Sequence, residues 1–534
     1  MKEKESFLKG AFILGLAGIF IKLMGGVFRI PLGNFLGAEG IGYYQAAYPI
    51  YTLFLTLATA GFPTALAKLV SEKNAKGDFK GANKIFRVSH LTLLLTGIVS
   101  FMIFFFGADY IVNDIIKNPG AYYAMLAIAP SLLFVPVMSA YRGYFQGRRD
   151  MSKIALSQIG EQFFRVILGL ALAFYLMELY GPKFGAAGAV MGATVGAMFS
   201  ILYLIVIYLI EGKKRKVELE KSKHFPDEST FTILKKLLVV AVPITIGAAV
   251  MPLVNMIDTV LVIRRLEVAG FSLSEANAMF GQLTGMAMTI VNLPSVLTVA
   301  MSMSLVPSIS ESFARGDKKQ ATKDTQNGIK VTLLMVLPAA FGIASLAHPL
   351  MSLLYPNEPS LVGDILLIIS PCVIFLGLIQ TMNGILQGMG KPMVPVIALL
   401  VGMAVKVFLS YTLTAMPQVN IFGSAIGTVS AYTIAVIIEI IYLVKVIKIK
   451  FSIKDFVVKP LITVITMFVV VKLSYAGFAG IIGTKLATVV AVLVGIIAYG
   501  IVLIFIGGIT KDEILTMPKG QKLYQVLRKI KLMK

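Results

Sequence analysis

Charged residues are scarce in this 534-residue sequence, cysteine occurs once, and tryptophan is absent. Only 14% of the residues are charged, against about 25% in ordinary soluble domains, which excludes a soluble globular protein. The single cysteine, Cys372, lies in an apolar run, so no disulfide can form within the chain. The sequence also lacks the histidine and cysteine spacings of metal sites and the phosphate-binding loop GxxxxGK(S/T), so it does not predict ATP hydrolysis by the chain itself.

What the sequence has instead is apolar length. Hydrophobic residues make up 57% of the chain, and the mean hydropathy is +0.84. They fall in repeated runs of about 18 residues or more, each long enough to cross a hydrocarbon core of about 30 Å as a helix. The N-terminal MKEKESFLKG leads into such a run without a small-residue cleavage site, which predicts a first membrane span and not a removed signal peptide. The predicted fold class is an all-α polytopic membrane protein.

Fourteen transmembrane helices are predicted from the apolar runs and the breakers between them. They lie near residues 8–31, 41–70, 88–108, 120–146, 154–177, 185–210, 232–262, 278–310, 327–354, 362–388, 392–415, 422–446, 456–475 and 484–507. With this assignment, 39 of the 49 Lys and Arg residues lie on one side of the membrane. That side holds the N-terminus, the loops after even-numbered helices and the C-terminal tail. The positive-inside rule then places both termini in the cytoplasm, and the net charge of +22 indicates orientation and not a nucleic-acid partner.

An internal repeat at a spacing of about 240 residues relates two groups of six predicted helices. LAKLVSEKNAKGD (66–78) aligns with LVPSISESFARGD (305–317), and the segment 127–147 aligns with 368–388. We therefore predict two six-helix repeats and a C-terminal two-helix hairpin. The predicted parts are an N-lobe (1–210), a cytoplasmic linker (211–231), a C-lobe (232–450), a two-helix hairpin (451–508) and a basic amphipathic cytoplasmic tail (509–534).

Two basic residues lie inside the first predicted span, where a charge costs about 2.5–3.5 kcal/mol on insertion scales. Lys22 and Arg29 are seven residues, or two helical turns, apart and therefore share one face. Two cations on one face suit a phosphate group, because Arg offers a fork of donors and Lys a compact charge. The alternative is that each side chain snorkels to the membrane interface. Pro31, with Gly25 and Gly26 before it, predicts a bend in this span.

Five further charged residues lie in or near later spans. Glu161 and Arg165, four residues apart, are predicted to pair with each other, and Arg142 is predicted to anchor the inner end of its span. Both arginines are also candidates for lining a central cavity. Asp258 needs a partner if it is charged, and Lys406 or a bound cation are the two candidates, so a structural pair and a coupling site both stay open.

Tyrosines are spaced for one helix face at the start of the second span. Because the chain has no tryptophan, Tyr44, Tyr48 and Tyr51 are predicted to form the aromatic belt at the membrane interface. The alternative places Tyr44 and Tyr48 in the cavity, where they would stack on a sugar.

Three segments together form a family pattern: residues 8–78, YRGYFQG (141–147) and ESFARGD (311–317). With them the chain resembles, over essentially its whole length, the polysaccharide-export branch of the multidrug/oligosaccharidyl-lipid/polysaccharide (MOP) superfamily. It is most similar there to MurJ-type lipid II flippases of the YtgP kind and to their stage V sporulation relative SpoVB.

The resemblance implies a V-shaped pair of six-helix lobes and alternating access. It implies movement of an undecaprenyl-pyrophosphate-linked peptidoglycan precursor between leaflets, with helices 13 and 14 forming a groove for the lipid tail. Lys22 and Arg29 fall where the family has two cavity-facing basic residues, which implies pyrophosphate binding. Sodium-linked members carry an acid matched by Asp258, but this chain has Lys406 and Ser410 at their helix 11 ligand positions. Our hypothesis is that the Lys406 ammonium stands where the ion would be.

The predicted function is therefore that of a lipid II flippase in the bacterial plasma membrane, a transporter and not an enzyme. We expect no cofactor and no metal, with a monovalent cation or the membrane potential driving the cycle. The expected partners are the lipid-linked oligosaccharide and membrane lipids, with cell-wall synthesis enzymes as further candidates, and the chain is expected to be a monomer. The alternatives are a flippase for another lipid-linked polysaccharide or a spore-cortex precursor, a cation-coupled multidrug exporter, and a non-transporting scaffold.

Overall fold

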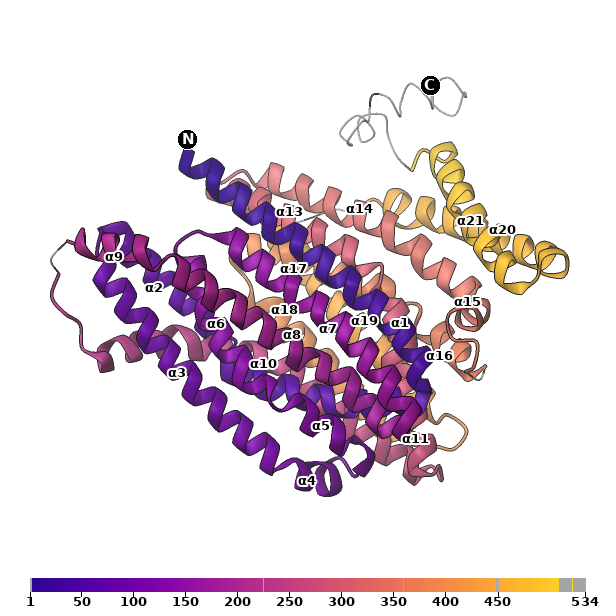
Figure 1. Cartoon of the computed structure of the whole chain (residues 1–534). Helices are drawn as coiled ribbons and strands as arrows, with labels where there is room; N and C mark the ends of the chain where they lie inside the picture. The colour runs from indigo at the N-terminus through magenta and orange to yellow at the C-terminus, as the bar shows by residue number, and fades with distance from the viewer. Residues whose placement is uncertain are drawn as a thin grey trace. The chain divides into compact units, whose positions relative to one another are not determined.

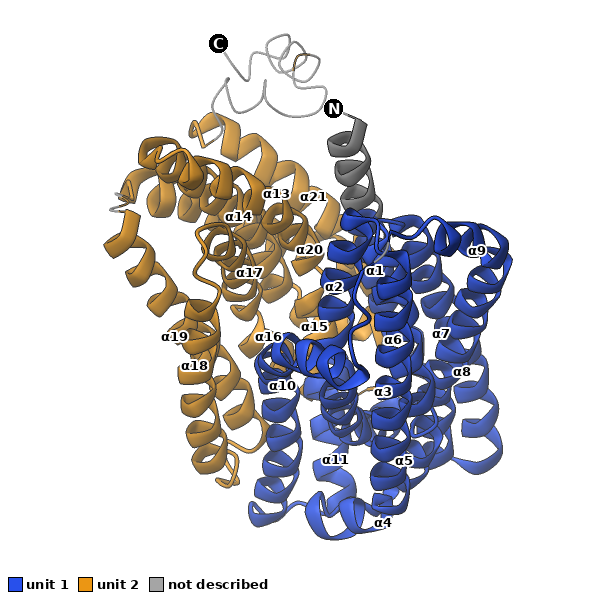
Figure 2. Ribbon diagram, turned by 90° about the vertical axis from the view of Figure 1, so that its left-hand side faces the viewer, with its two compact units in different colours: residues 1–286 blue, residues 287–534 orange. Residues whose placement is uncertain are grey.

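The computed structural model describes residues 2–223, 225–358, 360–447, 449, 451–508 and 521, with side chains from residue 14 onward in those ranges. Every regular element in these residues is a helix, as the apolar runs predict (Figure 1). The predicted amphipathic tail, 509–534, lies outside the described residues except for position 521. The chain divides into two compact units, Met1–Met286 and Ala287–Lys534 (Figure 2).

Unit 1 contains the helices of the first repeat and the beginning of the second. They are α1 (Lys2–Thr59), α2 (Phe62–Lys76), α3 (Phe79–Phe106), α4 (Ala108–Tyr110), α5 (Tyr122–Ile128), α6 (Ser131–Gly147), α7 (Met151–Tyr180), α8 (Pro182–Ile210), α9 (Gly212–Glu220), α10 (Thr230–Val268) and α11 (Leu273–Gly281). Short π and 3-10 turns lie at Ile111–Ile115, Pro119–Ala121 and Gln282–Ala287. Helix α1 runs alongside α7 and α8 (Figure 1).

Helix α1 combines the first two predicted spans and breaks at one residue. Gly37 has φ 63° and ψ 179°, a conformation that glycine tolerates because it has no side chain. Pro31 lies inside helical backbone, and the break in α1 occurs six residues later, at Gly37; the bend predicted near Pro31 stays a prediction. The apolar stretch Leu14–Lys76 is 63 residues long, or about 95 Å as helix, which is enough for two spans of about 30 Å.

Helix α10, the first of the second repeat, packs inside unit 1 against α1 and α2. The Gly61 amide donates to Thr245 Oγ1 at 3.0 Å, and a Cβ built on Gly61 would lie 2.0 Å from the Ala241 carbonyl oxygen. This contact requires glycine at position 61 and brings α10 against the first repeat. The predicted lobe boundaries at 210 and 232 follow the repeat, whereas the compact units divide at 286, so those boundaries stay a prediction.

Unit 2 contains the rest of the second repeat and the two final helices. They are α12 (Met288–Asn292), α13 (Ser295–Ala314), α14 (Lys318–Ser345), α15 (Ala347–Leu354), α16 (Leu361–Ile369), α17 (Cys372–Gly388), α18 (Met393–Leu413), α19 (Ile421–Ile447), α20 (Lys459–Ile482) and α21 (Thr484–Phe505). Helices α20 and α21 pack on each other and on α14 and α15, around Leu346, Met467, Val471 and Ala491.

Twelve helices in the described residues are long and apolar enough to cross a membrane, or up to 13 if α16 and α17, bent by 40°, form one span. Every predicted span overlaps helix in the structure, but the spans at 41–70, 120–146 and 278–310 are each interrupted, at 60–61, 129–130 and 293–294. The number fourteen depends on dividing Leu14–Lys76 in two and on including the bent pair, and it stays a prediction.

The internal repeat is present in the local packing of each unit. Asp78 and Asp317 both cap the helix that follows, accepting from the amide of the third residue on at 2.8 and 3.0 Å. A Cβ on Gly147 would lie 2.8 Å from the Ala67 carbonyl oxygen. The matching Cβ on Gly388 would lie 2.8 Å from the carbonyl oxygen of Val306, the repeat equivalent of Ala67. The same close helix contact is therefore built twice.

Candidate functional site

Three tyrosines of α1 and one arginine of α7 form the core of a polar cluster within unit 1. We call Tyr44, Tyr48, Tyr51, Arg165 and Arg29 the arginine–tyrosine cluster. The Tyr44 and Tyr48 rings stack with centroids 5.6 Å apart, and those of Tyr48 and Tyr51 lie 5.9 Å apart at 51°. Tyr44 and Tyr51 are each only 4% exposed. The prediction that these tyrosines form an interfacial belt is therefore wrong, because side chains packed inside the unit do not face lipid.

Arg165 provides the charge at the centre of this cluster. Its guanidinium donates to the Tyr48 hydroxyl at 2.8 Å and lies 5.4 Å from the centre of the Tyr48 ring. Arg29 is half-buried and close enough for its charge to act on the same hydroxyl. The Arg165 guanidinium thus has a phenol as its acceptor and no carboxylate partner among the described residues, an arrangement that favours an anion beside it.

A second arginine lies next to this cluster and is neutralised. The Arg142 guanidinium donates to Glu161 at 2.7 Å, to Ser157 at 2.9 Å and to Ser200 at 3.1 Å. The ion pair is largely buried, with side chains 17% and 24% exposed. Glu161 is therefore paired with Arg142 and not, as its spacing predicted, with Arg165. Arg142 is accordingly a bonded interior residue, not a simple anchor at the membrane surface.

Lys22 and Arg29 both lie on the first segment of α1, as predicted. This segment packs on α7: a Cβ on Gly25 would lie 3.6 Å from Gln162 Nε2, and one on Gly169 would lie 3.4 Å from the Phe28 ring. Lys22 is exposed in the isolated chain and Arg29 is half-buried. Neither forms an ion pair with a residue whose side chain is described. Their pyrophosphate role stays a prediction.

Asp258 and Lys406 lie in different compact units, Asp258 half-buried on α10 and Lys406 on α18. Lys406 is 8% exposed and sits beside α19, where a Cβ on Gly427 would lie 3.2 Å from its carbonyl oxygen. Whether these two residues pair directly stays a prediction. No group of three or more His, Cys, Asp or Glu in the described residues is arranged to hold a metal ion.

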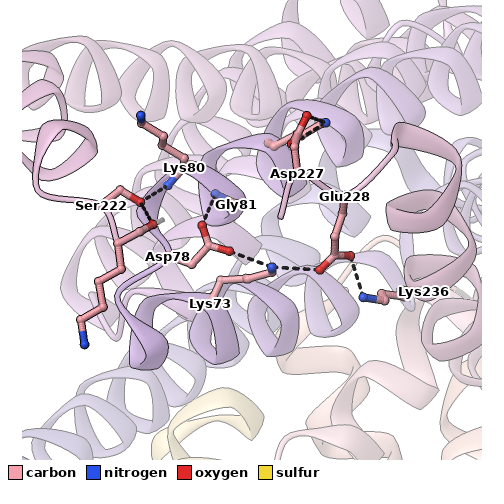
Figure 3. Close-up of polar contacts among 10 residues, drawn as sticks. Lys73, Asp78, Lys80, Gly81, Ser222, Asp227, Glu228 and Lys236 are labelled. Atoms are coloured by element: carbon pink, nitrogen blue, oxygen red, sulfur yellow. Dashed lines mark hydrogen bonds and ion pairs between the residues drawn. The ribbon is translucent and has the colours of Figure 1, made fainter. Parts of the chain in front are cut away.

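A third cluster fastens the linker to the loop between α2 and α3 (Figure 3). Lys73 donates to Asp78 at 2.7 Å and pairs with Glu228 at 2.9 Å, and Lys236 bonds the other Glu228 oxygen at 2.6 Å. Lys84 pairs with Asp227 at 2.7 Å in the same region. These donors, Lys236 foremost, hold the pKa of the Glu228 carboxyl below its ordinary value. With its charges paired internally, this cluster fixes the chain and leaves little net charge for a ligand.

Sequence reasoning missed three features of these sites. The first is the set of partners of Arg142, which lie 15 to 58 residues away in the sequence. The sequence pointed to them only weakly, through two small polar residues inside apolar spans, Ser157 and Ser200. The linker cluster combines charges that look like ordinary surface residues. Glu439, fully buried on α19, was visible only as one acid in the run AVIIEIIYLV.

The helical architecture, the repeat and the interior cationic cluster define a multi-pass membrane transporter. The Polysaccharide biosynthesis protein family matches residues 7–313, and the MatE family matches residues 243–412. The chain belongs to the Polysaccharide biosynthesis protein family, as a MurJ/SpoVB-type member of the MOP superfamily.

Individual relatives agree with this assignment. Stage V sporulation protein B of Bacillus subtilis (strain 168) is 29% identical over 96% of this chain and 98% of its own length. Lipid II flippase MurJ of the same organism is 30% identical, covering 80% of this chain and 81% of that protein. A solved structure of lipid II flippase MurJ in an inward closed conformation shares the fold, with a TM-score of 0.67 and 19% identity over 92% of this chain and 98% of that one.

Proposed function

We propose that the protein is a flippase that moves undecaprenyl-pyrophosphate-linked peptidoglycan precursor, lipid II, from the inner to the outer leaflet. The observation that carries the proposal is the Arg165 guanidinium, which donates to the Tyr48 hydroxyl at 2.8 Å in unit 1 and has no ion pair among the described side chains. Glu161 neutralises Arg142, whereas Arg165, Arg29 and Lys22 form no ion pair within the described side chains. This excess of positive charge on α1 and α7 suits a pyrophosphate, and buried cations are costly unless an anion or a wet cavity meets them.

In the proposed mechanism the two lobes alternate access to a central cavity. Lys22 and Arg29 capture the pyrophosphate from the cytoplasmic side, and Arg165 adds a forked donor deeper in the unit. The stacked Tyr44 and Tyr48 rings offer a flat surface to the sugar. The membrane potential or a cation drives the cycle, and both termini lie on the cytoplasmic side of the bacterial plasma membrane.

The prenyl tail is proposed to remain in lipid beside α20 and α21. These helices bury small and apolar side chains against α14 and α15, and their outer surfaces are apolar and exposed. Leu473, Ile481 and Ile496 are 68%, 78% and 64% exposed. Exposed apolar side chains of this kind suit acyl and prenyl chains, because covering them with lipid removes apolar surface from water.

The test is complementation of a flippase-depleted bacterial strain. The double variant Lys22→Ala/Arg29→Ala is expected to reach the membrane and to leave lipid II inaccessible to an external probe. Lys183→Ala, which removes an exposed lysine elsewhere in unit 1, is the matched control and should complement fully. Normal delivery of lipid II by the double variant would contradict the proposed pyrophosphate site.

Two of the matches support other substrates as further candidates. Because stage V sporulation protein B covers more of the chain than MurJ does, a spore-cortex precursor is the second candidate cargo. The match of 243–412 to the MatE family makes a cation-coupled drug exporter the third. Rescue of cortex formation and direct drug efflux assays separate these from lipid II transport.

A further inference from the structure

Glu439 on α19 is an acid that the proposed transport mechanism does not use. Its side chain is 0% exposed, and neither carboxylate oxygen has a hydrogen-bond partner among the described residues. Three of its neighbours on α19, Ala435, Val436 and Leu443, belong to the apolar core of unit 2 and are at most 4% exposed. An ionised carboxylate without a partner is costly in such surroundings, whereas the neutral acid is tolerated.

Glu439 and Lys406 lie too far apart along the axis of α19 for their side chains to pair. On α19, Gly427 is level with Lys406, because a Cβ there would touch the Lys406 carbonyl oxygen and side chain. Glu439 follows Gly427 by twelve residues, which is about 18 Å along the helix. It lies eight residues before the end of the helix at Ile447, or about 12 Å along the helix axis.

The helices packed against α19 are α18, α17, α16 and α14. Their acids have other partners: Asp364 on α16 pairs with His348 at 2.9 Å, and Asp324 on α14 accepts from Ser308 at 2.6 Å. The remaining titratable side chains on these helices and on α19 are Cys372, Tyr411, Lys318, Lys319, Lys323, Lys330, Tyr432, Tyr442 and Lys445. No described residue, these included, forms a hydrogen bond with the Glu439 carboxylate.

In the first repeat, the equivalent helices contain an acid that is paired with a cation. There Arg142 bonds Glu161 and Ser200. The repeat equivalents of Arg142 and Ser200 are Asn383 and Ile438, so Glu439 follows the position that meets the arginine in the first repeat. Asn383 Oδ1 is itself buried and has no hydrogen-bond partner among the described residues. The second repeat thus has asparagine in place of the arginine, and its buried acid has no cation to pair with among the residues that the structure describes.

We propose that Glu439 is a proton-binding site of unit 2, protonated while it is buried and able to exchange its proton when α19 becomes accessible to water in another conformation. Because the acid binds its proton more tightly in the buried state, protons bias the equilibrium between the two conformations. This inference rests on the proposed transport function and names the proton as its coupling ion.

The first measurement does not need transport. Infrared spectra of the full-length protein in liposomes at neutral pH are expected to contain the carbonyl band of a protonated carboxylic acid in apolar surroundings. Glu439→Gln should remove that band, and Glu311→Gln, the same change at a glutamate that is 62% exposed, should leave it. Gln is a neutral replacement of the same shape, so the fold should be retained. An unchanged band in Glu439→Gln would overturn the proposal.

Stability against pH gives a second readout. If the folded state holds the neutral acid, stability falls as pH rises above the value for a free glutamate, about 4.3, because the unfolded chain then releases a proton that the folded chain keeps. Glu439→Gln should match the wild type at low pH and unfold at a higher temperature than the wild type at pH 8. Identical pH profiles for the two proteins would contradict a proton on Glu439.

The coupling itself is tested in vesicles that report the flipping of a fluorescent lipid-linked pyrophosphoryl sugar. An imposed pH gradient should change the wild-type rate several-fold and leave that of Glu439→Gln unchanged. An equal response of both proteins would overturn the coupling role. If neither protein flips the lipid under any gradient, the proposed function fails, while the infrared band still decides whether Glu439 binds a proton.

Discussion

The two repeats build the same helix contacts but treat buried charge differently. Gly147 and Gly388 pack equally closely against matching carbonyl oxygens, 67 and 306, and Asp78 and Asp317 cap matching helices. In the first repeat, however, a buried arginine has an acid and two serines as partners. In the second repeat the acid Glu439 has no hydrogen-bond partner in the part of the chain that the structure describes.

This comparison teaches that backbone packing and charge are separable. The close contacts depend on small residues and carbonyl positions, so they survived in both repeats. The interior side chains were free to differ, because each repeat needs only that its own buried charges be paired, neutralised or bound to a ligand. The differences are therefore where we place function.

The largest effect is expected for Arg142→Asn, which puts into the first repeat the residue type that the second repeat has at the equivalent position, Asn383. Arg142→Asn should cost about 3 kcal/mol or more, because Glu161 would remain buried without a cation. The measurement is thermal unfolding in detergent. Adding Glu161→Gln should restore a large part of the loss. If the single and double variants unfolded together, the pair would not be the reason for the cost.

The shared backbone contact can be tested at both places at once. Gly147→Ala and Gly388→Ala should each destabilise the protein, by about 1–3 kcal/mol, because a Cβ would overlap the facing helix. Gly342→Ala, where nothing lies within 4 Å, is the control and should be neutral or slightly stabilising. A strong effect at only one of the two repeat positions would show that the repeats do not pack equivalently.

Tyr48→Phe tests a contact between a charged and a polar side chain that the first repeat contains. It removes the hydroxyl that accepts from Arg165, and it should cost about 1–2 kcal/mol in thermal unfolding because a half-buried guanidinium loses an acceptor. The second repeat has Ala287 at the equivalent position. Ala287→Ser changes a position without this partner and serves as the control. Equal stability of Tyr48→Phe and the wild type would mean that the bond is not maintained.

The smallest effect is expected at the linker, which the charge cluster around Lys73 and Glu228 fastens to the first repeat. Because Lys236 and Lys73 lower the pKa of Glu228, its contribution to stability is present above the unfolded value of about 4.3 and is lost as pH falls below it. Hydrogen exchange at residues 221–236 should therefore speed up on acidification. Glu228→Gln should show fast exchange already at pH 7 and little further change. A pH-independent wild type would remove Glu228 from this role.

The sequence alone determined the helical membrane class, the span positions and the repeat. Each depends on properties summed over neighbouring residues, such as hydropathy over about 18 positions, or on spacing along the chain. For the same reason it placed Lys22 and Arg29 on one face of one helix. The bend predicted near Pro31 stays a prediction, and the break that the structure shows in α1 lies at Gly37.

Only the tertiary structure decided which charges meet. Arg142 reaches an acid 19 residues away and Arg165 a tyrosine 117 residues away, so local spacing paired Glu161 with the wrong arginine. Burial of Tyr44 and Tyr51, and isolation of Glu439, likewise depend on which helix faces turn inward. Hydropathy predicts that a helix enters the membrane, but helix packing fixes what each of its faces contacts, and pairing and protonation follow from those contacts.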